Sequence, residues 1–137
     1  MKALIGPWDG EGNRDISIEL DAYDTWNVDY TLAVVAAPLL RQLRSRSHSY
    51  GLVDPDDVPT DIPTDDKYGT MESWHWVMDE MIWAFEYKAK DMDAGDMCAD
   101  KCANFGDPVC RACLNETQER LTNAFKLFGK YYENLWD

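Results

Sequence analysis

The only cysteines in this chain of 137 residues lie within one short run, CADKCANFGDPVCRAC. They are Cys98, Cys102, Cys110 and Cys113. They form a C-x3-C pair and a C-x2-C pair, and Gly106 and Pro108 allow the chain to turn between the pairs. Four thiolates in a tetrahedron suit zinc, and a closed site of this kind is structural rather than catalytic. The spacing therefore predicts a four-cysteine zinc knuckle over residues 96–114.

Three other states of these cysteines stay open: two disulfides, an iron–sulfur cluster, or free thiols. Disulfides need an oxidising compartment, and the N-terminal run MKALIGPWDG has no apolar stretch of signal-peptide length. The spacing is not one of the well-known ferredoxin patterns. Lys101 and Arg111 would partly offset the charge of a four-thiolate zinc centre. Zinc is the preferred interpretation.

Length and composition indicate one soluble domain, residues 1–137, with a real hydrophobic core. Six Trp and seven Tyr argue against disorder. No stretch approaches the roughly 18 apolar residues that a membrane span needs. The net charge of −13 disfavours direct binding to nucleic acid and suits either a basic protein partner or simple solubility.

The acidic residues are concentrated in DPDDVPTDIPTDD, residues 54–66, which holds six Asp, three Pro and no basic residue. This composition predicts an extended or mobile loop within residues 47–69. Arg41, Arg44 and Arg46 lie just before it. These arginines are expected to pair with the loop, with binding of an anion as the alternative.

The N-terminal segment, residues 1–23, contains a strand pattern in which Ile16, Ile18 and Leu20 alternate with polar residues. Its expected partner is another copy of the chain or the loop at residues 51–53. A helix is predicted over residues 24–46, with Asp24 as its N-cap. Pro38 inside it predicts a kink or a break, because proline removes one helical hydrogen bond.

Two further helices are predicted, over residues 70–90 and 115–136. Thr70 caps the first, and Asn115 with Gln118 resembles a capping box at the start of the second. The expected core residues are Trp74, Met78, Met81 and Phe85 in one helix and Leu121, Phe125, Phe128, Tyr132 and Leu135 in the other. The predicted fold class is therefore mainly α: a three-helix domain with a short β element and a zinc-stapled loop between the second and third helices.

A second face of the helix at 70–90 carries tryptophans and carboxylates. These residues are Trp76, Asp79, Glu80, Trp83 and Glu86. Such a stripe is costly to expose without a purpose, so it is a candidate protein-binding surface. Burial of this face is the preferred interpretation, with the carboxylates paired to Arg120, Lys126 or an arginine of the first helix.

An enzymatic interpretation would use these acids as magnesium ligands of a helical nucleotide hydrolase. Such sites need paired E-x-x-E and E-x-x-D turns, and the one E-x-x-E, Glu116 to Glu119, is expected near a helix start, where acids complement the helix dipole. His48 and His75 are not part of a nucleophile motif. No catalytic residue is assigned, and an enzyme is not favoured.

Four long blocks cover roughly the three predicted helices and the first linker. They are DTWNVDYTLA (24–33), VDPDDVP (53–59), WVMDEMIWAFE (76–86) and LFGKYYENLWD (127–137). Together they resemble a family of small proteins encoded by tailed bacteriophages. The cysteine run departs from the family pattern, in which this insert is polar and variable, so zinc would be a local staple. The resemblance implies a phage origin and an infected-cell setting, and it carries over no catalytic residue.

The leading functional hypothesis is a phage accessory or virion-associated binding protein. It would engage a host or phage protein in the host cytoplasm or the virion, as host-takeover factors do, through the acidic, Trp-rich surface. Two alternatives stay open. One is sequestration of a nucleotide-like ligand near Arg41, Arg44 and Arg46; the other is magnesium-dependent nucleotide hydrolysis. The predicted partner is a protein, a homo-oligomer is compatible with the unpaired strand, and no direct contact with nucleic acid or membrane is expected.

Overall fold

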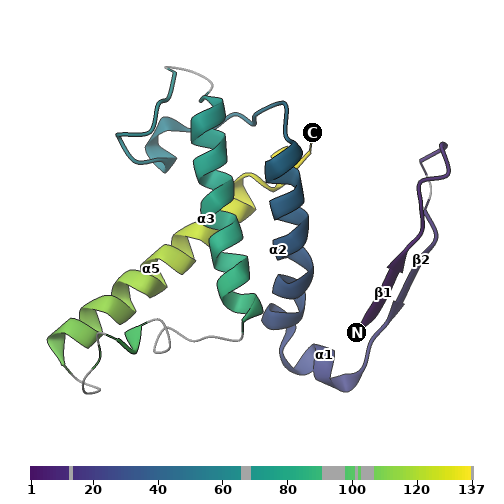
Figure 1. The fold of residues 1–137 in the computed structure, drawn as a ribbon, viewed down its shortest axis with the longest axis horizontal. Coiled ribbons are helices and arrows are strands. Elements are labelled where there is room, and N and C mark those ends of the chain that lie inside the picture. Colours follow the sequence, from purple (N-terminus) through teal and green to yellow (C-terminus); the bar gives the residue numbers. More distant parts are fainter. Residues whose placement is uncertain (13, 66–68, 91–97, 101, 103–106, 137) are drawn as a thin grey trace.

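The computed structural model describes residues 1–12, 14–65, 69–90, 98–100, 102 and 107–136. The fold is mainly helical with one short two-stranded sheet, as the sequence predicts (Figure 1). The elements are β1 (Lys2–Ile5), β2 (Ile16–Glu19), α1 (Ala22–Trp26), α2 (Val28–Arg46), the 3-10 turn η1 (Pro55–Asp57), α3 (Met71–Ala89), α5 (Pro108–Lys130) and the 3-10 turn η2 (Tyr132–Asn134).

The β element is an antiparallel hairpin of β1 and β2, in which Ala3 lies opposite Ile18 and Ile5 opposite Ile16. The expected partners of the second strand, another copy or residues 51–53, are therefore wrong. The turn between the strands contains Gly10 and Gly12, both with φ near +90°, a conformation that glycine adopts without strain. In Figure 1 the hairpin stands beside the helices and joins them through α1.

The predicted first helix is divided in two. Asp21, not Asp24, is the N-cap of α1, and Asp24 completes a capping box with it. Asn27 has non-helical backbone angles and separates α1 from α2. Helix α2 continues through Pro38, so the predicted break there is wrong. Packing of α2 along α3 offsets the hydrogen bond that proline removes.

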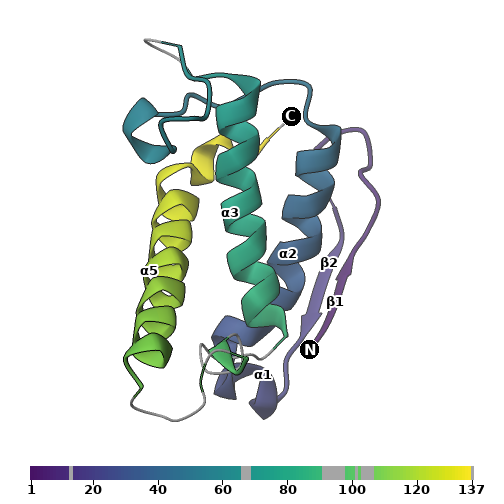
Figure 2. The ribbon, with the colours of Figure 1, turned by 60° about the vertical axis from the view of Figure 1, so that its left-hand side comes forward.

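Helix α3 follows the prediction closely. Thr70 is its N-cap and accepts the Ser73 N–H at 3.1 Å. The predicted core residues of this helix are all buried. They are Trp74, Met78, Met81 and Phe85. Helix α3 lies between α2 and α5 in Figure 2, and α5 crosses it in Figure 1. Because α3 contacts both helices, it is the centre of the domain.

Helix α5 begins earlier than predicted, at Pro108, and Asn115 lies inside it. The cap is Asp107, whose Oδ1 accepts the Val109 N–H at 3.0 Å, and a proline at the first helical position is already set for the helix. Its buried seam agrees only in part with the predicted one: Leu121 is buried, and Phe128 and Leu135 are partly buried against the main core. The buried residues of its C-terminal half and cap are Leu121, Ala124, Leu127 and Tyr131, while Phe125 and Tyr132 are exposed.

Part of the acidic loop is held against the C-terminal end of α5. Val53 and Val58 are buried in the main core. The Tyr131 hydroxyl accepts the Asp54 N–H at 2.9 Å and donates to Asp57 at 2.5 Å. Burial first, and the hydrogen bond to Asp57 second, raise the pKa of Tyr131 to about 12. The expected extended loop is therefore wrong for residues 53–58.

The basic partner of this loop is also not the one predicted. Lys130 Nζ lies 3.1 Å from Asp54 and 2.6 Å from Asp57. These contacts raise the pKa of Lys130. The three arginines of α2 form no ion pair with the loop among the described residues.

Candidate functional site

The three candidate carboxylates of α3 are each bound to an arginine of a neighbouring helix. The ion pairs are Arg44–Asp79 (3.1 Å) and Arg41–Glu86 between α2 and α3, and Arg120–Glu80 (2.6 Å) between α5 and α3. This is the pairing that the burial interpretation anticipated for Arg120 and the arginines of the first helix. The acidic side chains therefore connect the helices of one chain.

The two tryptophans of the same face are half-buried. Trp76 packs against the main core, and Trp83 packs against a second cluster around Tyr87 and Leu121. The Arg120 guanidinium lies 3.9 Å from the centre of the Trp83 ring while it binds Glu80. The predicted binding surface is thus largely a contact between helices, and its acids are neutralised by charges of the same chain.

These pairs also bear on the two small-molecule hypotheses. Arg41 and Arg44 are engaged by carboxylates, which leaves Arg46 as the exposed arginine of the three that forms no ion pair with the described residues. Asp79, Glu80 and Glu86 face three different arginines rather than one another. Within the described part of the chain, no three His, Cys, Asp or Glu side chains are placed to hold a metal ion.

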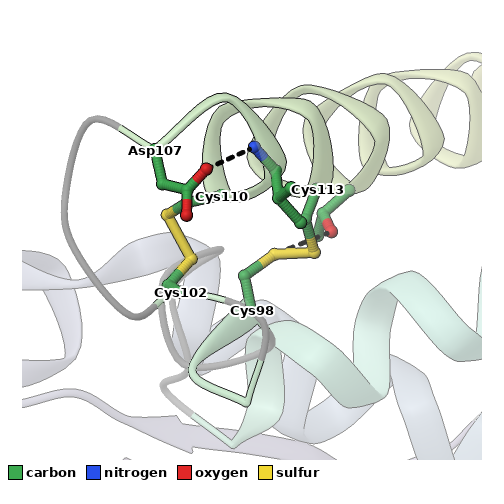
Figure 3. The surroundings of a disulfide bond; sticks show 7 residues. Cys98, Cys102, Asp107, Cys110 and Cys113 are labelled. Atoms are coloured by element: carbon green, nitrogen blue, oxygen red, sulfur yellow. Dashed lines mark hydrogen bonds between the residues drawn. A yellow bond between two sulfur atoms is a disulfide. The ribbon is translucent and has the colours of Figure 1, made fainter.

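The four cysteines are joined in two disulfides, between Cys98 and Cys113 and between Cys102 and Cys110 (Figure 3). Each bond links one cysteine of the C-x3-C pair to one of the C-x2-C pair, so both pairs meet at the N-terminal end of α5. This differs from the predicted single zinc ion, because a disulfide sulfur is not a thiolate. Residues 96, 97, 101 and 103–106 of the predicted knuckle lie outside the described residues.

A different surface, the outward face of α2, is left uncovered by the residues that the structure describes. Toward α3 this helix buries small residues, Ala33 and Ala37, together with Leu40. Its larger apolar residues point away from the core. They are Val28 (48% exposed), Leu32 (60%), Val34 (44%), Val35 (40%) and Leu39 (62%). A helix that buries alanines and exposes leucines and valines is typical of an interaction surface.

Part of this face forms one wall of a groove between α2 and α5. The opposite wall consists of three of the five residues predicted as the core of the last helix, and Phe85 of α3 forms the floor. The groove holds about 500 Å³. A second hollow shares its middle residues and extends it toward Leu43 and Leu135. The wall residues are Leu32, Val35 and Leu39 of α2, Phe125 and Phe128 of α5, and Tyr132 of η2.

The groove is almost free of charge. Of the described residues, Asp29 is the only charged one that lines it, and the Asp29 carboxylate binds Lys88 Nζ at 3.0 Å. The hydrogen bond from Lys88 holds the pKa of Asp29 below its ordinary value. In a chain with a net charge of −13, a nearly neutral apolar groove is where another molecule can approach with little repulsion.

The hairpin carries a second uncovered apolar face. Cross-strand neighbours lie on the same face, so Ala3, Ile5, Ile16 and Ile18 share one side of the hairpin. The other side carries Lys2, Leu4, Ser17 and Glu19. The three isoleucines of the apolar side are 58–64% exposed, and Leu20 continues the alternation at 62%. This pattern is typical of a sheet that is covered on one side, yet the described residues leave it open.

Sequence reasoning detected the alternation of Ile16, Ile18 and Leu20 but not the open groove. Leu32, Val35 and Leu39 fall within the amphipathic pattern that indicates core, and the pattern gives no information about which side the neighbouring helix occupies. Two features of the sequence could have distinguished the exposed apolar residues of α2 from the buried ones. One is the row of alanines at 33, 36 and 37, which lets a helix approach closely, and the other is the width of the apolar region around α2.

Comparison with known proteins adds no family to this description: no protein-family model, curated protein or solved structure matches the chain. Among the described residues, no helix is both long and apolar enough to cross a lipid bilayer.

Proposed function

We propose that this chain is a bacteriophage accessory binding protein that acts by protein–protein contact, in the infected host cell or the virion. Its contact surface is the apolar side of the hairpin together with the α2–α5 groove. This moves the binding surface away from the acidic face of α3, because Asp79, Glu80 and Glu86 are already bound to arginines. The resemblance of four sequence blocks to small phage proteins supports the phage setting.

The observation that carries the proposal is the orientation of α2. Leu39 is 62% exposed while the adjacent Leu40 is 5% exposed, and Leu32 is 60% exposed while the adjacent Ala33 is buried. Exposing large apolar side chains while burying alanines leaves stabilising burial unused. A partner that covers the groove would bury these side chains and gain the stabilisation that the single chain leaves unused. Buried apolar anchors at the centre of a contact contribute most of the affinity.

The proposal is tested with a photo-crosslinking amino acid placed at position 39 in the full-length chain, produced in infected cells. We expect a discrete cross-linked protein from position 39. Position 42, one turn away on α2, is the matched control, because Gln42 is exposed and does not line the groove. Equal labelling from both positions, or labelling from neither, contradicts the proposal.

We also propose that the reduced chain binds one structural zinc ion through Cys98, Cys102, Cys110 and Cys113. The support is proximity: each disulfide joins the two cysteine pairs to each other, so reduction frees four thiols at one end of α5. Cys98 and Cys110 are almost fully buried, which favours a closed site. Zinc binding and disulfide formation compete for the same sulfurs, so one state excludes the other.

The zinc proposal is tested by purifying the chain under reducing conditions and measuring bound metal and free thiols together. One zinc ion per chain, released when an oxidant forms the disulfides, is the expected result. Replacement of all four cysteines with alanine is the control and must abolish the metal. A reduced, folded chain with four reactive thiols and no zinc contradicts the proposal.

A further inference from the structure

The hairpin face and the α2–α5 groove are two apolar surfaces on one chain that do not cover each other. We infer that a second copy of this chain covers them: in a two-fold dimer, the hairpin of each chain lies in the groove of the other. This inference rests on the proposed binding function and names one partner for that surface. It follows from the direction in which the hairpin is held, from the match in size, and from symmetry.

The hairpin is tied to the body at its base. The N-terminal ammonium of Met1 binds the Asp24 carboxylate at 2.7 Å, and the capping box of α1 holds Asp24 in turn. The Thr31 hydroxyl donates to the Asp24 carbonyl at 3.1 Å, which fixes α1 to the start of α2. The hairpin is therefore an arm with a defined direction. In that direction its isoleucines and the groove of the same chain are both exposed.

The dimensions of the arm and the groove agree. Each strand has four residues, and Leu20 extends the apolar side of β2 to five residues, or about 14 Å at strand rise. The α2 wall from Leu32 to Leu43 spans about 17 Å at helix rise. Eight large apolar side chains of the two surfaces are 37–64% exposed: Ile5, Ile16, Ile18, Leu20, Leu32, Leu39, Phe125 and Tyr132. At about 100 Å² each they supply roughly 800 Å² per chain, which is one side of a standard interface. A lone two-stranded hairpin is only marginally stable, so covering its apolar side also stabilises the arm.

Symmetry favours a second copy over a different partner, and the groove itself presents no unpaired acid to it. Asp29, the one charged residue among the described groove residues, already forms an ion pair with Lys88. A two-fold axis makes the contact reciprocal, because each chain supplies one arm and one groove and both apolar surfaces are covered at once. A different partner would have to supply a groove for the arm and a segment for the groove.

The test is sedimentation of the purified full-length chain and of two pairs of matched variants. The hairpin pair is Ile18→Glu and Ser17→Glu, adjacent residues on opposite faces of the hairpin. The groove pair is Leu39→Glu and Gln42→Glu, where only Leu39 lines the groove. We expect the parent chain, Ser17→Glu and Gln42→Glu to be dimers. Ile18→Glu and Leu39→Glu should be monomers, with dimer affinity weakened by about 100-fold or more.

Mixing the two monomeric variants distinguishes arm exchange from other dimers. The Leu39→Glu chain keeps its arm and the Ile18→Glu chain keeps its groove, so the mixture should form a heterodimer with one intact contact. Circular dichroism with urea unfolding checks that each variant remains folded. A monomeric parent chain, equal effects of Ile18→Glu and Ser17→Glu, or no heterodimer on mixing would each overturn the inference.

The same experiment separates this inference from the proposed function. A monomeric chain whose position 39 still cross-links another protein in infected cells removes the dimer and leaves the binding function in place. A dimer in purified protein that cross-links from position 39 only to itself supports the inference and removes the need for a host partner. A monomer that cross-links to nothing removes both.

Discussion

The two sides of α2 differ in burial: one is packed against α3 and the other is exposed. The side toward α3 is packed with Ala33, Ala37 and Leu40 against the large residues of α3, such as Trp74 and Met81. The side away from α3 carries leucines and valines that the described residues do not bury. The difference shows that helix contacts are decided by the fit of small against large side chains. Hydrophobicity alone does not choose the buried side.

Leu40 and Leu39 provide the strongest test of this comparison, because they are adjacent, chemically identical and differ in burial. Leu40→Ala should lower the free energy of unfolding by about 2–5 kcal/mol, since it removes methyl groups from a packed core. Leu39→Ala should cost less than about 0.5 kcal/mol in dilute protein, because its side chain is largely exposed to solvent in the single chain. Urea unfolding monitored by tryptophan fluorescence measures both.

The protein concentration serves as the control. If a second chain covers Leu39, the cost of Leu39→Ala should rise with concentration, whereas the cost of Leu40→Ala should rise little. Equal costs for the two variants in dilute protein would mean that both sides of α2 are buried within one chain, and the comparison would be wrong.

The N-terminal end of α5 extends the comparison to a region that is held covalently. Reduction in the presence of a metal chelator should lower stability by about 3 kcal/mol for the bond that closes 15 residues and by slightly less for the bond that closes 8. Thermal unfolding of the oxidised and the reduced chain measures the difference. The variant with all four cysteines replaced by alanine should not respond to reductant. If zinc restores the stability of the reduced chain, the metal-bound state stabilises this end of α5 as the disulfides do.

The sequence predicted the elements whose signals are local. Thr70 as the cap of α3 and its core residues follow from capping chemistry and helical spacing, and the structure confirms them. The same spacing was wrong for part of the last helix, because Phe125 and Tyr132 each lie one position after a buried residue, Ala124 and Tyr131, and stay exposed. Local periodicity defines an apolar face, but only the neighbour's position decides how much of it is buried.

The candidate site was harder to predict for the same reason. The acids of α3 stand out in the sequence as one face of a helix, yet their partners Arg41, Arg44 and Arg120 lie 35–45 residues away in the chain. No local rule selects among the long-range partners. The pairing of β2 with β1 was missed because β1 contains Leu4 and Ile5 in a run too short to show alternation.

Tyr131 extends the comparison from the apolar residues that α2 buries to a buried residue that forms hydrogen bonds. Tyr131→Phe should destabilise the chain by about 1–3 kcal/mol, because the phenol is buried and bonds both Asp54 N–H and Asp57. Its pKa is raised to about 12 in the folded chain, against about 10 in the unfolded chain. Below pH 10 both states keep the proton and the stabilisation is complete. Between pH 10 and 12 only the folded state keeps it, so stability falls as pH rises.

The measurement is a series of urea unfolding curves from pH 8 to the highest pH at which unfolding stays reversible. The phenylalanine variant should show a shallower fall above pH 10 than the parent chain. Some fall should remain, because the pKa of Lys130 is also raised by Asp57 and Asp54 and acts with the same sign. If stability falls with pH in parallel for the two proteins, the pKa of Tyr131 is not higher in the folded chain than in the unfolded chain.

Breaking the ion pairs of α3 should have the smallest effects on stability. These pairs are of two kinds, one partly buried and one exposed to solvent. Arg120→Ala should cost about 1–2 kcal/mol, because its guanidinium binds a Glu80 side chain that is 13% exposed and also stacks on Trp83. Arg44→Ala should cost no more than about 0.5 kcal/mol, since its partner Asp79 is 57% exposed and solvent screens the pair.

A double-mutant cycle with Glu80→Gln isolates the charge contribution of Arg120 from its stacking on Trp83. If Arg120 acts mainly through the ring, Arg120→Ala should keep most of its cost in the Glu80→Gln background. If it acts mainly through charge, most of that cost should disappear. A cost for Arg44→Ala equal to that for Arg120→Ala would mean that the acidic face of α3 is uniformly buried. Its contacts would then resemble the inner side of α2 rather than a solvent-screened edge.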